Sequence, residues 1–528
     1  MTTPCPVLNH IAIALLFGLL GLPGGAQAAD PARPNVLVIM ADDLGFGDLS
    51  CYGATEIVTP QLDRLAASGL RFTSGYATAS TCTPTRFSFL TGVYAFRQKG
   101  TGIAPPNGPA IIAEGTPTIA SMLRSVGYRT AVIGKWHLGL GGSDGPRWNE
   151  RISPGPLDIG FDHCFLLPTT NDRVPQVYLE DREVRGLEAG DPLWVGSKKP
   201  SPDHPTGLTQ RDSLRMNWSH GHNGTIHNGI SRIGFYTGGV EARFRDEDLA
   251  DAWIEQSRAW MAAESNQPFF LFFASHDVHV PRMPHERFQG KSALGPRGDS
   301  ILELDWTVGA LLDELEQNGQ RESTLVVFCS DNGPVLDDGY ADDALEKNGT
   351  HRSGGPFRGG KYSVYEGGTR TPFLASWPGV IEPGVSDEMI ATIDLYASLA
   401  ALTGAAPETA EKAKDSVNVK GALLGQAGAE GREELVQQDN GGGGTFGFRS
   451  GQWKLLRHDS GKTNNLVVES PLAKTEVPKY QLFDLNADPR EENDLFSVQP
   501  DVAARLVGRL EEIVGETSGA PKAKSAAP

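Results

Sequence analysis

Four short apolar runs recur along the chain, and polar residues follow each of them directly. They are rich in Val, Ile, Leu and Phe and occupy residues 35–40, 130–133, 269–273 and 324–328. Unbroken apolar runs of this length are typical of strands buried on both faces. We expect helices between them, at residues 60–67, 119–126, 246–261 and 299–317. Alternating strands and helices predict an α/β fold in which helices sandwich a large, mostly parallel sheet.

The polar residues after the four runs are the first candidates for a functional site. Asp42 and Asp43 follow the first run, and Gly134-Lys135-Trp136-His137 follows the second. His276 and His279 follow the third, and Asp331-Asn332 follows the fourth. Because ligands of parallel sheets bind at the carboxyl ends of the strands, we expect these four clusters to converge.

The rest of the chain divides into regions of different amino-acid composition. Residues 146–239 are rich in Gly and Pro, and we expect long loops there that shape a substrate pocket. After about residue 425, a hairpin at 446–456, a strand at 480–485 and an amphipathic helix at 500–514 predict a smaller C-terminal α+β subdomain. We therefore expect a catalytic domain at 30–425, this subdomain at 426–517 and a disordered tail at 518–528.

The N-terminus and the overall charge indicate where the protein works. Residues 11–22 are apolar, and Ala26-Gln27-Ala28 offers a cleavage site, so residues 1–28 are expected to be a secretory signal peptide. The apolar run is too short to span a membrane. The net charge of −18 argues against a nucleic-acid partner. We expect a secreted or periplasmic protein with no membrane attachment once the leader is removed.

A cysteine lies at the expected start of another helix. In the stretch 80–92, Pro84 suits the first helical turn and Gly92 a left-handed helix end. Cys82 would then lie at the helix N-terminus, where free N–H groups favour an anion. That placement is expected to lower the pKa of the thiol.

Asp42, Asp43, Asp331 and Asn332 offer only oxygen ligands. Such a set suits a hard divalent cation, and no Cys/His spacing indicates zinc. We expect Ca²⁺, with Mg²⁺ as the alternative.

Several separated motifs resemble one known family in the same order. Cys82-x-Pro-x-Arg86, followed by Leu-Thr-Gly, resembles the signature of the type I, formylglycine-dependent sulfatases, which are arylsulfatase-like members of the alkaline-phosphatase-like superfamily. The stretches at 134–139, 279–281 and 360–368 resemble its remaining active-site motifs. The resemblance covers about residues 34–514 and implies that fold.

The resemblance implies specific roles. A maturation enzyme would oxidise Cys82 to formylglycine (3-oxoalanine), whose hydrated aldehyde is the nucleophile in that family. Lys135, Lys361 and Arg86 would offset sulfate charge, His279 and Lys361 would protonate the departing alcohol, and His137 would act as base. The implied catalytic residues are Cys82, Arg86, Lys135, His137, His279 and Lys361. The implied metal ligands are Asp42, Asp43, Cys82, Asp331 and Asn332. We prefer His279 to His276 because a proline follows it two residues later.

The substrate is less closely defined by the sequence. The expected loops carry polar side chains able to bind sugar hydroxyls, and they resemble those of secreted bacterial carbohydrate sulfatases. This favours a sulfated saccharide, with a sugar 6-O-sulfate or an aryl sulfate as candidates. The candidate substrate contacts are Asn171, Asp172, Arg173, His220, His222, His227, His351 and Arg352.

Two other functions are compatible with this scaffold. One is a phosphonate monoester or phosphodiester hydrolase of the same superfamily, whose members typically have histidine where this chain has Asn332. The other is a catalytically silent glycan-binding protein. The intact set of nucleophile, acid and base residues argues against a catalytically silent protein, because binding alone does not need them.

Overall fold

The computed structural model describes residues 1–2, 33–196, 198, 204–263, 265–406, 412–439, 444–458 and 478–515. The signal peptide expected at 1–28, apart from its first two residues, and the tail expected at 518–528 lie outside the described residues. Within these described ranges, no helix is both long and apolar enough to cross a membrane.

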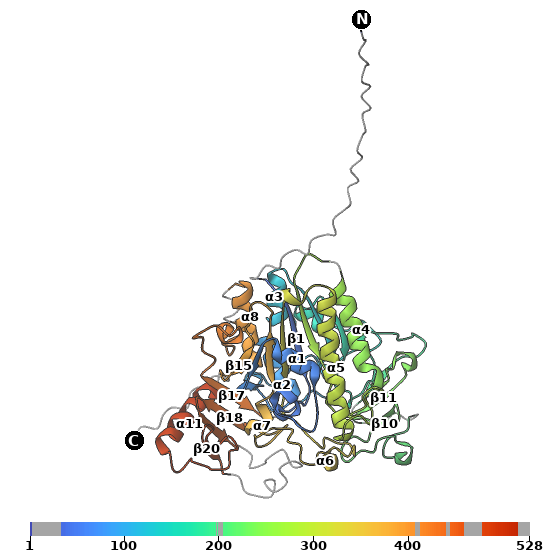
Figure 1. Cartoon of the computed structure of the whole chain (residues 1–528). Helices are drawn as coiled ribbons and strands as arrows, with labels where there is room; N and C mark the ends of the chain where they lie inside the picture. Colours follow the sequence, from blue (N-terminus) through green and yellow to red (C-terminus); the bar gives the residue numbers. More distant parts are fainter. Residues whose placement is uncertain are drawn as a thin grey trace.

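A ten-stranded sheet forms the centre of the molecule (Figure 1). Its middle contains the four expected strands, which lie side by side in the order β13-β1-β12-β4 and run parallel. They are β1 (Asn35–Ala41), β4 (Arg129–Lys135), β12 (Phe269–Ala274) and β13 (Thr324–Ser330). This confirms the expected α/β class with a mostly parallel sheet.

Shorter strands extend the sheet on both sides. Beyond β13 it continues with β14 (Phe373–Ser376), β2 (Leu70–Phe72) and β15 (Gly384–Ser386). Beyond β4 it continues with β5 (His163–Leu167), β6 (Leu179–Glu180) and β7 (Glu183–Val184). A small separate pair joins β3 (Gly75–Tyr76) to β16 (Ile390–Ala391).

The expectation of loops throughout 146–239 was wrong for β5, β6 and β7, which belong to the central sheet. The apolar part of β5 is short, and the strand pairs with β4, which lies about thirty residues earlier, so no local pattern reveals it. Among its described residues, the rest of this region contains 3₁₀ turns at Pro156–Ile159 and Arg211–Ser213 and four short strands: β8 (Trp194–Gly196), β9 (Ile226–His227), β10 (Ile230–Ser231) and β11 (Phe235–Thr237).

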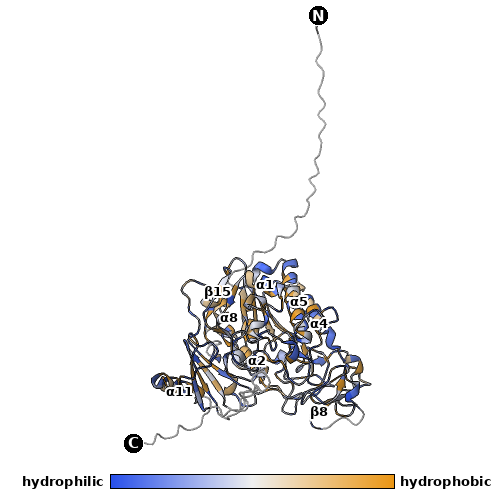
Figure 2. Cartoon of the chain, turned by 60° about the horizontal axis from the view of Figure 1, so that its bottom comes forward, coloured by the Kyte–Doolittle hydropathy of each residue, from blue (hydrophilic) through white to orange (hydrophobic). Residues whose placement is uncertain are grey.

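Helices cover both faces of the sheet. One face packs against α1 (Pro60–Ala67), α4 (Leu249–Ala262) and α5 (Gly295–Gln317). The other face packs against α2 (Cys82–Thr91), α3 (Ile119–Ser125) and α8 (Leu395–Thr403). Successive residues of β1 enter opposite cores, as the alternation of a strand requires. The apolar strands therefore lie inside, while the more hydrophilic parts of α4 and α5 lie outside (Figure 2).

Two helix starts differ from the expectation. A short 3₁₀ turn at Asp246–Asp248 precedes α4, and α5 begins at Gly295 instead of Asp299. The carboxylate of Asp299 accepts hydrogen bonds from the backbone of residues 290–292. Asp299 therefore fixes the preceding loop and does not cap the helix.

Helix α2 has the ends that the sequence predicts. Thr81 at its N-cap is extended, and Gly92 ends it in the left-handed conformation with φ 66°. Every residue of the helix is buried. A side chain at Gly92 would place its Cβ 2.3 Å from that of Ala413, so this position needs glycine for space as well as conformation. Cys82 is thereby fixed at the helix N-terminus.

A second, antiparallel sheet forms the C-terminal part of the chain. It contains β17 (Glu434–Gln438), β18 (Phe446–Ser450), β19 (Trp453–Arg457) and β20 (Tyr480–Asp484). Helix α11 (Pro500–Gly515) packs its apolar side on this sheet through Ala503, Leu506 and Leu510. The expected hairpin, strand and helix are confirmed, and the domain boundaries stay a prediction.

A buried ion pair joins the two sheets. Glu366, at the start of α7 (Glu366–Thr369), lies 2.8 Å from the ammonium of Lys454 on β19, and both side chains are fully buried. The other carboxylate oxygen of Glu366 accepts a hydrogen bond from Tyr76 at 2.6 Å. Arg370 also lies 3.2 Å from Glu366, but Lys454 is the closer cation, and removing one member of a buried pair weakens the compensation of the other charge.

We expect Lys454→Met to lower the free energy of unfolding by about 3–5 kcal/mol, because Glu366 would lose its closest cation. Chemical denaturation monitored by tryptophan fluorescence measures this. Lys479→Met, at an exposed lysine beside β20, is the matched control and should change stability by less than about 0.5 kcal/mol. Equal unfolding midpoints for Lys454→Met and the wild type would contradict the expectation.

Candidate active site

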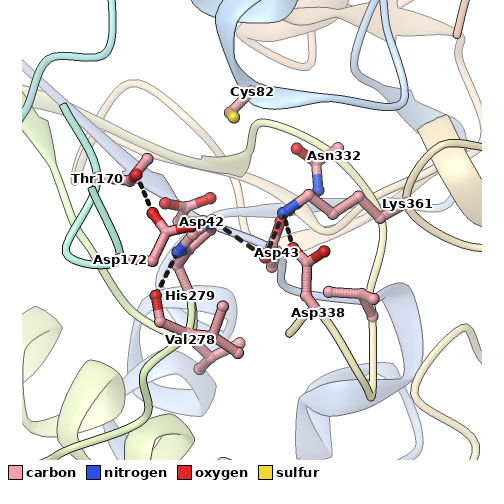
Figure 3. A network of polar contacts seen from close by, with 12 residues as sticks. Asp42, Asp43, Cys82, Thr170, Asp172, Val278, His279, Asn332, Asp338 and Lys361 are labelled. Atoms are coloured by element: carbon pink, nitrogen blue, oxygen red, sulfur yellow. Dashed lines mark hydrogen bonds and ion pairs between the residues drawn. The ribbon is translucent and has the colours of Figure 1, made fainter. Parts of the chain in front are cut away.

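The carboxyl ends of the four middle strands meet at one buried cluster of charges. Lys135 ends β4 and pairs with Asp42, which follows β1. Asp331 follows β13 and pairs with Arg86 of α2 at 2.9 Å. Asp43 lies 2.8 Å from the ammonium of Lys361. These contacts show that the clusters converge, as the strand order predicts, and Figure 3 shows Asp42, Asp43 and Lys361 of this cluster.

Three residues at this cluster have backbone conformations that non-glycine residues rarely adopt. Asp43, His137 and Tyr362 have φ of 58°, 54° and 72°. Such a conformation costs on the order of 1 kcal/mol or more for each residue, so the surrounding contacts must enforce it. This concentration of strain marks the cluster as a candidate functional site.

The guanidinium of Arg86 holds two of the strand ends together. Its Nε donates to Asp331 Oδ2 at 2.9 Å, and Nη1 donates to the carbonyl of Lys135 at 3.1 Å. Burial alone would lower the pKa of Arg86, but the carboxylates of Asp331 and Asp42 outweigh it and raise the pKa. Arg86 is therefore a permanent cation that fixes the position of Asp331.

The carboxylates at this cluster are not fully compensated by the protein's own cations. Burial, together with the nearby Asp331, raises the pKa of Asp42 to about 8. Its Oδ1 and the amide oxygen of Asn332 are buried and have no hydrogen-bond partner among the described residues. Ligand atoms of Asp42, Asp43 and His279 lie within 4.8 Å of one another. Unpartnered buried oxygens and excess negative charge fit a hard divalent cation here.

Cys82 lies beside these residues and is 2% exposed. Burial raises the pKa of its thiol, so the expectation that the helix N-terminus lowers it was wrong. Loss of water around the sulfur outweighs the favourable charges of Lys135 and Lys361. An unmodified Cys82 would consequently be a neutral thiol and a weak nucleophile at neutral pH.

His137 directs one ring nitrogen at Cys82. Its Nδ1 lies 3.2 Å from the sulfur, and its Nε2 lies 3.1 Å from the carbonyl oxygen of Ala104. Because a carbonyl can only accept, Nε2 carries the proton and Nδ1 presents a lone pair to Cys82. Burial and the charge of Lys135 hold the pKa of His137 well below its usual value. This histidine is therefore neutral and able to accept a proton.

Lys361 and His279 lie on opposite sides of Asp43 (Figure 3). The ammonium of Lys361 lies 2.7 Å from Asp338 as well as 2.8 Å from Asp43. Burial opposes its charge, but these two carboxylates hold its pKa well above the usual value. His279 donates from Nδ1 to the carbonyl of Val280 at 2.7 Å, which leaves Nε2 3.9 Å from Asp43.

The two candidate histidines after β12 have different surroundings. His279 borders the cavity beside Cys82, and burial with the cations Lys361 and Lys135 holds its pKa well below the usual value. His276 instead lies against Trp253, whose indole N–H points at its Nδ1 at 3.3 Å. The geometry therefore favours His279 as the residue that faces a substrate.

A cavity of about 90 Å³ opens between these side chains. Of the expected site residues, it brings together Cys82, His137, Asp172, Arg173, His222, His279 and Lys361. It also contains three residues that the sequence analysis missed, Ile103, Asp338 and Tyr362. Tyr362 follows Lys361 directly and donates to Asp338 at 3.0 Å, but no motif or periodicity marks Asp338.

The candidate substrate contacts fall into two groups. Asp172 accepts from His222 at 2.9 Å and pairs with Arg173 at the cavity wall. Asn171 lies behind this wall, with its Oδ1 3.2 Å from Nδ1 of His279. His220 is largely exposed, with its ring centre 6.3 Å from that of His222. One wall of the cavity is therefore formed or supported by Asp172, Arg173, Asn171 and His220.

Three candidates lie away from the cavity. His227 is buried between the hydroxyl of Tyr236 at 2.8 Å and the carbonyl of Phe244 at 2.7 Å. Burial lowers its pKa to about 4, and its position indicates a structural role. His351 and Arg352 border a different pocket of about 560 Å³. Polarity alone does not reveal which way a loop side chain points, so loop composition does not separate these three residues from those at the cavity.

Comparison with known proteins agrees with this geometry. The family model described as Sulfatase matches residues 34–405. The chain is 44% identical over 501 residues to the N-acetylgalactosamine-6-O-sulfatase of Bacteroides thetaiotaomicron, covering 95% of this chain and 97% of that one. It is 33% identical over 509 residues to human arylsulfatase A, covering 94% and 89%.

Solved structures agree as well. A Bacteroides thetaiotaomicron structure connected with the metabolism of multiple glycosaminoglycans has a TM-score of 0.87 at 44% identity, covering 92% of this chain and 100% of that one. A sulfatase from Pseudoalteromonas sp. has a TM-score of 0.68 at 23% identity, covering 92% and 91%, and supports the fold alone. The family match, the extent of the identity and the shared fold show that this chain belongs to the sulfatase family and is a sulfuric ester hydrolase.

Proposed function

We propose that the protein removes a 6-O-sulfate from a sulfated carbohydrate, with N-acetylgalactosamine 6-sulfate as the first sugar to test. The observation that carries the proposal is the cavity itself, which combines Cys82 and His137 with the cations Lys361 and Arg173. The 44% identity to an N-acetylgalactosamine-6-O-sulfatase, over nearly the full length of both chains, supports the choice of sugar.

Two groups complete the proposed site. Formylglycine at position 82, made by a maturation enzyme, fits the buried, neutral thiol beside His137. A calcium ion, with magnesium as the alternative, would be held by Asp42, Asp43, Asp331, Asn332 and residue 82. When bound, the ion would offset charge on the sulfate, and the modified residue would supply the nucleophilic oxygen.

The protein's own cations bind and orient the sulfate in this proposal. Lys361 and Arg173 line the cavity, and Lys135 pairs with Asp42 of the charge cluster. Fixed cations of this kind stabilise the charge that develops on the sulfate oxygens. Arg86 acts indirectly, since it is bonded to Asp331 and the backbone of Lys135. Arg86 thereby positions the carboxylate of Asp331.

Proton movement is divided between two sides of the cavity. His137 takes a proton at Nδ1 from the group at position 82, because its other nitrogen already donates to Ala104. Lys361 and His279 face the departing alcohol, and Lys361 keeps a proton that it can donate. His279 becomes protonated at Nε2 when the bound sulfate offsets the cations that lower its pKa.

Polar residues on the remaining walls are proposed to recognise sugar hydroxyls. Asp172 and His222 form one hydrogen-bonded pair, and Asp338 with Tyr362 forms another. A site that hydrogen-bonds hydroxyls discriminates strongly against sugars that lack them. The expected leader and the family together support a secreted or periplasmic enzyme.

The central test is sulfate release from defined sugars. We expect release from N-acetylgalactosamine 6-sulfate with a kcat/KM at least about a hundredfold above that for the 4-sulfate, and none from an aryl phosphonate ester. Cys82→Ala should abolish release. In active wild-type protein, the Cys82 peptide should show the mass of an aldehyde in place of the thiol. Active protein with an intact thiol would overturn the proposed nucleophile, and preferred phosphonate cleavage the proposed reaction.

Calcium binding can be measured without turnover. We expect Asp331→Asn to weaken Ca²⁺ binding by more than about tenfold, because a charged oxygen ligand is lost. The readouts are metal content after dialysis and the rise in melting temperature with added Ca²⁺, which follows ligand linkage. Asp212→Asn, at an exposed carboxylate, is the control. Equal calcium retention in the Asp331 and Asp212 variants would contradict the assignment.

The role of His279 depends on the leaving group. We expect His279→Ala to reduce kcat on the sugar sulfate by about 10²–10⁴, because a sugar alkoxide needs a proton as it departs. The loss on 4-nitrophenyl sulfate should be much smaller, since that leaving group needs little help. His163→Ala, at a half-buried histidine that begins β5 and does not border the cavity, is the control and should leave kcat on both esters nearly unchanged. Equal losses in His279→Ala on both esters would argue against an acid role.

A further inference from the structure

A second pocket, which we call the arginine pocket, lies beside the catalytic cavity. It has a volume of about 560 Å³. Pro334, Leu336, the loop 348–359 and the residues Arg490 and Glu492 form its walls. His351 and Arg352, two of the three candidate substrate contacts that lie away from the catalytic cavity, are among its lining residues.

The arginine pocket is basic in a strongly acidic protein. Arg352, Arg358 and Arg490 border it, against the single carboxylate of Glu492. The whole chain has a net charge of −18. A local excess of arginine in such a chain favours anionic ligands, because guanidinium groups match carboxylate and sulfate oxygens in geometry.

Two of these arginines form no side-chain hydrogen bond or ion pair with the described residues. Arg352 and Arg490 are exposed, and no ion pair or side-chain hydrogen bond is found for either within the described part of the chain. By contrast, Arg297 is buried and bound to Asp48 through two hydrogen bonds of 2.8 and 2.6 Å. The guanidinium groups of Arg352 and Arg490 are therefore available to a ligand.

The loop that carries Arg352 is held rigidly. Gly47 donates to the carbonyl of Ser353 at 2.8 Å, and a Cβ at Gly47 would lie 2.1 Å from the carbonyl oxygen of Arg352. His351 is bonded to the buried Asp48 at 2.8 Å. Gly47 and Asp48 belong to the segment that follows Asp42 and Asp43. The pocket is thus built on the same segment as the proposed metal site.

Neighbouring residues of the same two chain segments line the two cavities. Pro334 and Gly359 border the arginine pocket, and Asp338 and Lys361 border the catalytic cavity. The backbone N–H of Lys361 donates to the carbonyl of Pro334 at 2.9 Å, which joins the two wall segments. The arginine pocket is therefore placed to receive a further sugar of a ligand that fills the catalytic cavity.

We propose that the arginine pocket binds the carboxylate of an acidic sugar that neighbours the sugar whose sulfate is removed. The inference rests on the proposed function, because it assigns an oligosaccharide to the same site. It makes the enzyme selective for acidic saccharides beyond the sulfated ring itself. Arg352 and Arg490 supply the charge, while Arg358 is restrained by its bond to the carbonyl of Glu491 at 2.7 Å.

The experiment compares two trisaccharides. Both have N-acetylgalactosamine 6-sulfate at the non-reducing end, followed by a hexuronate in one and by the same sugar reduced to the neutral alcohol in the other. Their affinities are measured by calorimetry in a Cys82→Ala background, which cannot turn them over. We expect about three- to tenfold tighter binding of the hexuronate form, as two exposed charge contacts allow.

The variant Arg352→Ala/Arg490→Ala should remove this preference and leave binding of the monosaccharide N-acetylgalactosamine 6-sulfate unchanged. Arg151→Ala, which removes an exposed arginine that borders neither cavity, should keep the preference. Equal binding of the two trisaccharides, or an unchanged preference in the double variant, would overturn the inference. Failure of the wild type to release sulfate from the monosaccharide would instead overturn the proposed function, so the two failures are distinguishable.

Discussion

The arrangement of the site depends on the burial of several charges at the carboxyl edge of one sheet. Asp42, Asp43 and Asp331 are fully buried there, and Arg86, Lys135 and Lys361 compensate them. An uncompensated buried charge costs several kcal/mol, so each of these side chains has little freedom to move. The compensation is incomplete at Asp42, whose pKa is raised to about 8 by burial and Asp331. A divalent cation would complete it.

The C-terminal sheet takes part in the same arrangement. Lys361 lies five residues before Glu366, which is paired with Lys454 of the C-terminal sheet. The backbone N–H of Glu366 also donates to the buried Glu491 at 2.7 Å, and Arg358 donates to the carbonyl of Glu491. The segment 358–366 therefore connects Lys361, the arginine pocket and the C-terminal sheet. A small subdomain remote in sequence thereby fixes one wall of the active site.

The remaining walls come from the long region between β5 and α4. Asp172, Arg173 and His222 lie on segments with little regular structure, where hydrogen bonds among side chains hold the loops in place. Substrate preference is expected to change most easily here, because these loops can vary without disturbing the strands that carry the charges. In the proposed function, the buried cluster supplies the reaction chemistry and the loops determine which sugar is bound.

The sequence by itself determined the four parallel strands, the helix that begins at Cys82, the C-terminal hairpin and helix, and the convergence of the polar clusters. These features follow from local patterns, because apolar runs, a helix-ending glycine and the position of residues after strands all act over a few residues. The tertiary structure alone decided that β5–β7 extend the sheet, that His227 is structural, and that His351 and Arg352 belong to a separate pocket. It also decided that Asp338 and Tyr362 face the substrate cavity and that burial raises the pKa of Cys82. Those outcomes depend on which distant segments pack together and how much water they exclude, and no local pattern encodes either.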